Sequence, residues 1–85
     1  MAIKKYMLFY TPMCPKCPKI KEFMEDKDIE KEWVDCATPE GLEKARELKV
    51  SNMPTVIFFD KDEKEVTRAK DIEEIKRVLE NKQLD

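Results

Sequence analysis

Histidine is absent from this chain of 85 residues, and glycine, serine and cysteine are scarce. Without histidine no Cys–His nucleophile pair can form, so a cysteine hydrolase is disfavoured. A structural zinc ion needs four ligands, which three cysteines without histidine do not supply within one chain. Three cysteines are also too few for the disulfide framework of a small secreted domain.

Long hydrophobic runs and a strong charge of either sign are absent as well. No apolar run approaches the roughly 18 residues of a membrane helix. The apolar run at residues 6–10 is too short for a signal peptide. Seventeen basic and nineteen acidic residues leave a net charge of −2, which favours neither nucleic acid nor a membrane surface as a partner. We therefore expect a cytoplasmic protein that binds neither.

Charged residues, in contrast, are abundant. They make up 42% of the chain, while asparagine, glutamine and serine are rare. This balance resembles the composition of hyperthermophile proteins, in which charge networks replace labile amides. The length fits one domain over residues 1–85, which we expect to be a monomer.

Four strands are predicted from the hydrophobic spacing, within the element order β-α-β-α-β-β-α. They are Tyr6–Tyr10, Glu32–Cys36, Thr55–Phe59 and Glu65–Thr67. The first is a continuous apolar run, which suits a strand covered on both faces. The turn between the last two strands lacks glycine, so we expect Asp62 or Glu63 to adopt the left-handed conformation.

Three amphipathic helices are predicted between and after these strands. The first opens at the cysteines, with Cys14 as the N-cap and Pro15 just inside the helix. Thr38 is expected to cap the second helix, and Asp71, followed by Glu74, the third. The predicted core faces are Cys17, Ile20, Phe23 and Met24; Leu42, Ala45 and Leu48; and Ile72, Ile75, Val78 and Leu79.

The motif Cys14-Pro15-Lys16-Cys17 places two of the three cysteines at the predicted start of the first helix. A free cysteine with a pKa of about 8.5 is only about 3% thiolate at pH 7. The free N–H groups and positive dipole of a helix N-terminus lower that pKa. The thiol of Cys17, one turn further on, can donate a hydrogen bond to a Cys14 thiolate, and Lys16 and Lys19 add positive charge. The motif therefore predicts a reactive dithiol.

Spacing also suggests a separate role for each cysteine. Two cysteines three residues apart in a helix bring their sulfurs within disulfide reach. Cys14, nearer the tip, is expected to attack a substrate disulfide, and Cys17, facing inward, to resolve the mixed disulfide. This predicts a thiol–disulfide oxidoreductase with Cys14 and Cys17 as catalytic residues and with no metal or cofactor. The alternative is a metal or iron–sulfur module in which the same pair is shared across a dimer.

Three features in register resemble one known group of proteins. A buried strand runs directly into the C-x-x-C motif at a helix start. Met53-Pro54-Thr55 precedes the strongest strand, as a cis-proline motif does in that group. The element order is that of the minimal fold and covers essentially the whole chain. On these grounds the chain resembles the thioredoxin superfamily, and more closely its small glutaredoxin-like members.

The resemblance implies a thioredoxin-like α/β fold, with a four-stranded mixed sheet in the order 2-1-3-4 and three helices on both faces. It also implies a cis peptide bond at Pro54, whose ring would face the two sulfurs. The backbone of Met53 would then be free to pair with an extended substrate segment. The candidate substrate-binding residues are Pro15, Lys16, Met53, Pro54 and Thr55.

Two departures from the family pattern bear on the partner. Met13 and Leu8 stand where thioredoxins carry a tryptophan and a buried acid, so the proton of Cys17 has to leave through water or another group. Glutathione-binding glutaredoxins carry a glycine pair before an acidic residue, whereas residues 67–71 contain no glycine. We therefore expect protein disulfides and an upstream thiol reductase as partners, with glutathione or another low-molecular-weight thiol as a further candidate.

The third cysteine, Cys36, has two interpretations. It is predicted to end the second strand, at the same edge of the sheet as the dithiol, where it could act as a third redox thiol. Free cysteines, however, are commonly small buried apolar side chains. We expect Cys36 to be such a core residue.

Overall fold

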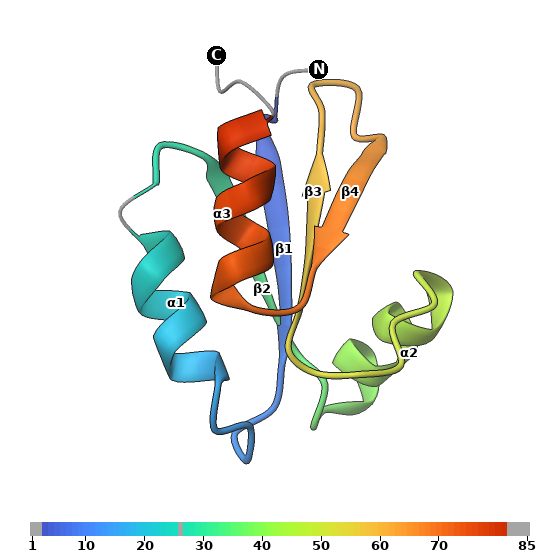
Figure 1. The fold of residues 1–85 in the computed structure, drawn as a ribbon. Coiled ribbons are helices and arrows are strands. Elements are labelled where there is room, and N and C mark those ends of the chain that lie inside the picture. Colours follow the sequence, from blue (N-terminus) through green and yellow to red (C-terminus); the bar gives the residue numbers. More distant parts are fainter. Residues whose placement is uncertain (1–2, 26, 82–85) are drawn as a thin grey trace.

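The predicted strands form one mixed sheet in the computed structural model, which describes residues 3–25 and 27–81 (Figure 1). The strands are β1 (Lys5–Tyr10), β2 (Glu30–Asp35), β3 (Thr55–Phe59) and β4 (Glu65–Ala69). Their order is β2-β1-β3-β4, with β1 parallel to β2 and antiparallel to β3, and β3 antiparallel to β4. The predicted sheet order is confirmed.

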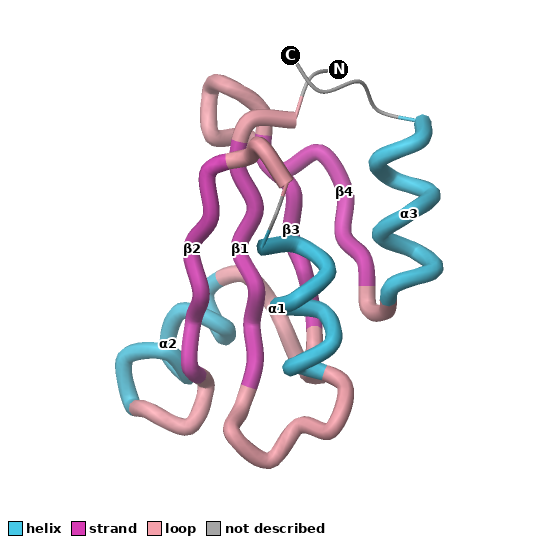
Figure 2. Tube along the Cα trace, turned by 90° about the vertical axis from the view of Figure 1, so that its left-hand side faces the viewer, coloured by secondary structure: helices cyan, strands magenta, loops and turns pink. Residues whose placement is uncertain are grey.

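Helices cover both faces of this sheet, as predicted. They are α1 (Cys17–Glu25), α2 (Pro39–Glu47) and α3 (Ile72–Asn81). Helices α1 and α3 lie on one face and α2 on the other (Figures 1 and 2). Tyr6 and Leu8 of β1 are buried in the core under α1 and α3, while Met7 and Phe9 are buried in the core under α2. The continuous apolar run of β1 therefore fills two cores at once.

The pairing of β1 with β3 creates the edge of the sheet at which the cysteine motif lies. Phe9 of β1 stands opposite Thr55 of β3. In an antiparallel pair the end of one strand lies beside the start of the other. The segment that follows β1 and carries Cys14 therefore lies next to the segment that precedes β3 and carries Pro54.

The start of α1 differs from the prediction. Cys14 is not its N-cap and Pro15 is not inside it, because α1 begins at Cys17. A helix with Cys14 as N-cap would need an N–H at position 18 to bond to the Cys14 carbonyl, and Pro18 has none. The first such bond instead joins the N–H of Ile20 to the carbonyl of Lys16, at 3.2 Å.

Strands β2 and β4 are longer than their hydrophobic patterns indicated. β2 begins two residues earlier than predicted and ends at Asp35, so Cys36 directly follows the strand. Glu30 and Lys31 are exposed, but they stand opposite residues of β1 in the sheet. β4 continues to Ala69, opposite Val56. The ends of both strands are set by backbone pairing with the neighbouring strand, which polar residues form as readily as apolar ones.

In the turn between β3 and β4, Glu63 takes the left-handed conformation, with a φ of 61°. This residue is one of the two for which that conformation was predicted. Asp60 supports the turn, because its carboxylate accepts hydrogen bonds from the N–H groups of Asp62 and Lys64, at 2.9 and 3.0 Å.

The core face of α2 also differs from the prediction. Leu42 was expected to be buried but is 41% exposed, whereas Gly41 and Ala45 are buried. Thr38 caps α2, and its hydroxyl accepts a hydrogen bond from the Gly41 N–H at 3.0 Å. A Cβ atom at position 41 would overlap with the carbonyl of Asp35. The helix therefore approaches the end of β2 at its glycine, and this approach turns Leu42 toward the surface.

This close approach predicts unequal effects on stability for two neighbouring substitutions. Gly41→Ala should lower the free energy of unfolding by about 1–3 kcal/mol, because the added methyl group forces α2 away from β2. Leu42→Ala should change it by less than about 0.5 kcal/mol, as expected at an exposed position. Urea denaturation of both variants measures the two effects. A larger loss for Leu42→Ala than for Gly41→Ala would contradict this account of the packing.

Candidate functional site

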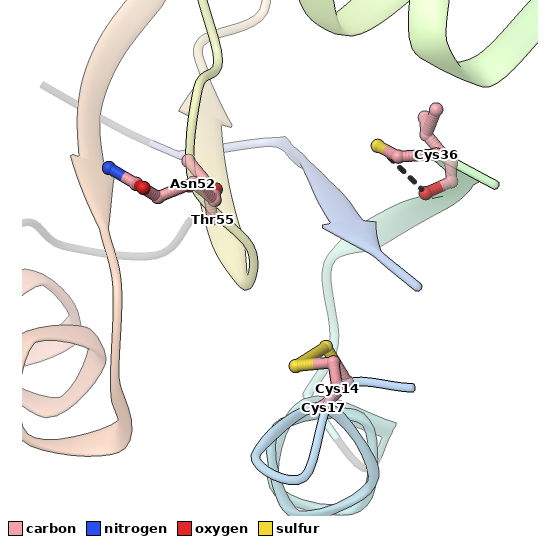
Figure 3. The surroundings of a disulfide bond; sticks show 6 residues. Cys14, Cys17, Cys36, Asn52 and Thr55 are labelled. Carbon is pink, nitrogen blue, oxygen red and sulfur yellow. Dashed lines mark hydrogen bonds between the residues drawn. A yellow bond between two sulfur atoms is a disulfide. The ribbon is translucent and has the colours of Figure 1, made fainter. Parts of the chain in front are cut away.

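Cys14 and Cys17 form a disulfide in the structure (Figure 3). Their Cα atoms are 5.4 Å apart, within the usual range for disulfides. The N–H of Cys14 donates a hydrogen bond to the carbonyl of Thr11, at 3.1 Å, so a tight turn leads from β1 to the pair. The prediction that the two sulfurs lie within bonding reach is confirmed.

The two cysteines have different environments. Cys14 is 9% exposed and Cys17 only 2%. Cys14 also lines a surface cavity of about 300 Å³, and Cys17 does not. The residues that line this cavity are Cys14, Pro15, Lys16, Asn52, Met53, Pro54 and Lys70. Four of the five predicted substrate-binding residues are therefore gathered around Cys14.

The wall of the cavity opposite the cysteine motif is the segment that precedes β3. The peptide bond between Met53 and Pro54 is cis, as predicted. None of the hydrogen bonds formed by the described residues uses the backbone N–H or carbonyl of Met53. Thr55, the fifth predicted residue, is buried outside this cavity, and its hydroxyl donates to the carbonyl of Asn52 at 2.6 Å. Thr55 therefore stabilises the segment that forms this wall.

The segment that leads to this wall begins at the C-terminus of α2. The N–H of Val50 donates to the carbonyl of Ala45, at 2.7 Å, and the N–H of Lys49 to that of Arg46, at 3.1 Å. Lys49 has a φ of 58°. This is the Schellman arrangement, in which glycine is the usual left-handed residue. The carbonyls of Leu48 and Lys49 have no partner within it.

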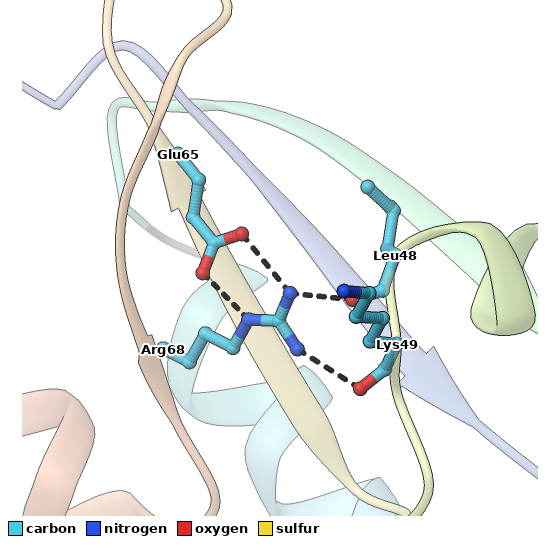
Figure 4. Close-up of polar contacts among 4 residues, drawn as sticks. All are labelled: Leu48, Lys49, Glu65 and Arg68. Atoms are coloured by element: carbon cyan, nitrogen blue, oxygen red, sulfur yellow. Dashed lines mark hydrogen bonds and ion pairs between the residues drawn. The ribbon is translucent and has the colours of Figure 1, made fainter.

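Arg68 of β4 supplies that partner (Figure 4). Its guanidinium donates hydrogen bonds to the carbonyls of Leu48 and Lys49. A cation is also favourable at the negative end of a helix. Two further hydrogen bonds, of 2.6 and 3.0 Å, join the guanidinium to the carboxylate of Glu65. The hydrogen bonds from Arg68 lower the pKa of Glu65 below its usual range.

Arg68 thereby connects the two ends of the loop that carries Pro54. Its side chain binds the start of the loop at Leu48 and Lys49, and its backbone stands opposite Ile57, just after the loop ends. This role of Arg68 was not predicted from the sequence. No local spacing signals it, because the bonded residues are 19 and 20 positions apart.

Two further cavity residues, Asn52 and Lys70, were also missed. Lys70 lies in residues 67–71, and an exposed lysine there gives no local signal that it would line the cavity. The neighbouring Asp71 behaves as predicted, since its carboxylate accepts a hydrogen bond from the Glu74 N–H at 2.9 Å and so caps α3. Leu8, at the place of the family's buried acid, is fully buried in the apolar core.

Cys36 lies away from the disulfide (Figure 3). It is buried in the core under α2, together with Phe9, Val34 and Ala45. Burial raises the pKa of the Cys36 thiol, and the charge of nearby Asp35 raises it further. The expectation that Cys36 is a core residue is confirmed.

Neither a metal-binding cluster nor a membrane helix is found among the described residues. Over residues 3–25 and 27–81, no three residues among Cys, Asp and Glu lie close enough together to bind a metal ion. Within that range, no helix is both long and apolar enough to span a bilayer.

Comparison with known sequences gives one family match. The family model for glutaredoxin matches residues 6–64, which include the C-x-x-C motif, Pro54 and the first three strands. A comparison with curated proteins finds no match.

Solved structures with the same fold include several thioredoxins. Thioredoxin 1 from the thermophilic eubacterium Thermosipho africanus is 32% identical, with a TM-score of 0.66, and the alignment covers 91% of this chain and 96% of that one. Thioredoxin O2 from Arabidopsis thaliana is 22% identical, with a TM-score of 0.77 and coverage of 94% and 75%. A Schistosoma mansoni thioredoxin is 26% identical, with a TM-score of 0.73 and coverage of 94% and 79%.

The position of Cys36 predicts that it reacts slowly. In the reduced protein at pH 7, iodoacetamide should modify Cys36 at least about tenfold more slowly than Cys14, because the raised pKa of Cys36 leaves little thiolate, whereas the N-terminus of α1 favours the thiolate of Cys14. Peptide mapping of timed samples measures both rates. Denatured protein, in which all three thiols should react alike, is the control. Equal rates in the native protein would contradict the burial of Cys36.

The Arg68–Glu65 pair predicts a pH-dependent contribution to stability. Because the pKa of Glu65 is lowered by folding, its ionised form stabilises the fold above the ordinary glutamate pKa of about 4.3, and this effect is lost as the pH falls further. Wild type should therefore exceed Glu65→Gln in free energy of unfolding at pH 7 by at most about 1 kcal/mol, since the pair is partly exposed. The difference should shrink below about pH 4.

The control for this pair is the same comparison in an Arg68→Met background. There Glu65→Gln should produce no pH-dependent difference, because the hydrogen bonds that lower the pKa are gone. A difference that persists unchanged at pH 3, or that survives in the Arg68→Met background, would contradict the assignment.

Proposed function

Because this chain belongs to the glutaredoxin family of the thioredoxin superfamily, we propose that it reduces disulfides of other proteins and so serves as their electron donor in cell redox homeostasis. Its fold and its cysteine pair are those of a thiol–disulfide oxidoreductase. The observation that carries the finer proposal is the cavity that Cys14 shares with the cis-proline segment. It provides an attacking sulfur and, beside it, an unpaired backbone at Met53.

The proposed reaction transfers two electrons from the dithiol to the substrate. The Cys14 thiolate attacks one sulfur of the substrate disulfide, and the other substrate sulfur leaves as a thiolate that takes up a proton. Cys17 then loses its proton and attacks the sulfur of Cys14, which releases the second substrate thiolate. The protein ends in the oxidised form seen in the structure, with the Cys14–Cys17 disulfide.

The first turn of α1 supports Cys14 as the attacking residue. Pro18 has no N–H, but Cys17 and Lys19 have N–H groups that no hydrogen bond among the described residues uses. Such groups at a helix N-terminus stabilise a nearby thiolate, and the charge of Lys16 acts in the same direction. The greater exposure of Cys14 also gives it the access that attack on a substrate requires.

The backbone of Met53 supports an extended protein segment as the substrate. A free N–H and carbonyl beside the reacting sulfur allow strand-like pairing, in which the backbone supplies affinity. The cycle closes when an upstream thiol reductase returns two electrons to the disulfide. One of the structural neighbours is a thioredoxin f2 solved in complex with ferredoxin:thioredoxin reductase. For this chain we propose a reductase partner in a reducing compartment, the cytoplasm.

Substitution of each cysteine tests the assignment of roles. Cys14→Ser should abolish reduction of an insulin-type disulfide substrate, a loss of at least about a thousandfold, because the attacking sulfur is removed. Cys17→Ser should still attack but should accumulate mixed disulfides with the substrate. Non-reducing electrophoresis and mass spectrometry detect these adducts. Cys36→Ala is the matched control and should retain the wild-type rate.

Normal activity of Cys14→Ser would exclude this function. The metal or iron–sulfur alternative is tested on protein purified without oxygen, by absorbance, elemental analysis and mass in solution. A coloured or metal-containing dimer that depends on both Cys14 and Cys17 would favour the alternative.

A further inference from the structure

The cavity around Cys14 contains positive charge without negative charge. Lys16 and Lys70 are its two charged residues, and no aspartate or glutamate lines it. The chain as a whole has the opposite balance, with a net charge of −2. The reacting sulfur therefore lies in a positive region of an acidic protein.

The two lysines approach the cavity from different elements. Lys16 immediately precedes α1, and Lys70 lies between β4 and α3. Both are exposed, and neither ammonium group forms an ion pair with a described residue. Some other lysines already have partners. Lys5 and Lys44 both bind Glu32, and the ammonium of Lys21 lies 3.6 Å from the ring centre of Tyr10.

Asp71 and Glu74, two acidic residues close to Lys70 in the sequence, bind backbone groups. The carboxylate of Asp71 accepts the N–H of Glu74, at 2.9 Å. The carboxylate of Glu74 accepts the backbone N–H of Lys70, at 2.7 Å. Both carboxylates thus bind backbone at the N-terminus of α3, where the helix dipole also offsets their charge. The Lys70 ammonium remains available to a partner.

Exposed apolar surface beside the sulfur favours a protein segment over a small thiol as that partner. Met13, adjacent to Cys14, is 90% exposed. It does not line the cavity, but it directly precedes Cys14 in the chain, so its exposed side chain adds apolar surface next to the motif. Asp71, which could otherwise meet the amino group of a small ligand, is occupied as the helix cap.

We propose that this groove, the cavity lined by Cys14, Lys16, Met53 and Lys70, binds an extended partner segment in which acidic residues flank the disulfide cysteine. The proposal rests on the disulfide reduction proposed above and specifies its substrate class. The Met53 backbone pairs with the segment, Cys14 attacks its sulfur, and the two lysines attract carboxylates on either side. Electrostatic complementarity of this kind sets specificity and association rate more than total affinity.

The expected preference is modest because both lysines are exposed. Two screened charge pairs should favour an acidic over a neutral segment by about threefold to tenfold in kcat/KM. The preference should weaken with added salt, since the Debye length falls from about 30 Å at 0.01 M to about 3 Å at 1 M ionic strength.

Three disulfide peptides of the same length, with glutamate, glutamine or lysine beside the cysteines, test the proposal. Wild type should reduce them in the order glutamate, glutamine, lysine. The double variant K16E/K70E should reverse that order. The matched control K61E/K76E carries the same change in net charge, on exposed residues outside the groove, and should keep the wild-type order.

The readout is the ratio of rates for the acidic and basic peptides. A change in the reactivity of Cys14 itself scales every rate equally and leaves this ratio unchanged. Hydroxyethyl disulfide, which is uncharged, reports that reactivity separately. If wild type reduced hydroxyethyl disulfide but reduced all three peptides at equal rates, only the acidic-segment proposal would be overturned. Failure of wild type to reduce any disulfide would instead overturn the proposed function.

Oxidised glutathione, a small disulfide that carries carboxylates, is the last test substrate. We expect it to be reduced more slowly than the acidic peptide and to depend less on Lys16 and Lys70. If glutathione disulfide were preferred and its rate fell most in K16E/K70E, the occupant of the groove would be a small thiol and the proposal would be wrong. An unchanged peptide order in K16E/K70E would overturn it equally.

Discussion

The antiparallel pairing of β1 with β3 is the interaction on which every wall of the site depends. It sets Phe9 opposite Thr55, so the chain leaves β1 and enters β3 at the same edge of the sheet. Cys14 follows the first strand and Pro54 precedes the second, and the two meet although they are far apart in sequence. All five residues of β3 are buried; Val56 and Phe58 lie in the core under α1 and α3, and Ile57 and Phe59 lie in the core under α2. A shift of register by one residue would exchange their faces, and it would also move Pro54 away from Cys14.

A second constraint acts on the loop between α2 and β3. This loop has to leave backbone groups of Met53 free, so hydrogen bonds within it cannot hold it in place at that point. Its ends are held instead. Arg68 binds the carbonyls at the start of the loop and lies opposite Ile57 beyond its end, while Thr55 bonds to the carbonyl of Asn52. The arrangement resembles binding loops in general, in which a rigid scaffold positions an open segment.

Much of the fold and of the site could be predicted because the relevant signals are local. The apolar runs of β1 and β3 and the cap at Thr38 each depend on a few adjacent residues, and the cis bond at Pro54 followed from the resemblance to the thioredoxin superfamily. The start of α1 was also within reach, because the missing N–H of Pro18 is visible in the sequence. The prediction followed the position of the cysteine, whereas the first available backbone hydrogen bond sets the start of the helix.

The remaining features depend on contacts between distant parts of the chain. Gly41 is buried in place of Leu42 because α2 approaches the carbonyl of Asp35, which no periodicity reports. The hydrogen bonds of Arg68 join residues about twenty positions apart. The place of Lys70 beside Cys14 follows from the path of β4, a strand whose pattern is only weakly hydrophobic.

The burial of Cys36 limits which disulfides the oxidised chain can form. Three thiols allow three intrachain pairings, and two of them would join Cys36 to the motif. In the folded protein Cys36 belongs to the core under α2, and the end of β1 separates it from Cys14 and Cys17 (Figure 3). A disulfide between Cys36 and the motif would therefore require the core under α2 to open. Oxidation and reduction then return the chain to the same two covalent forms in every cycle.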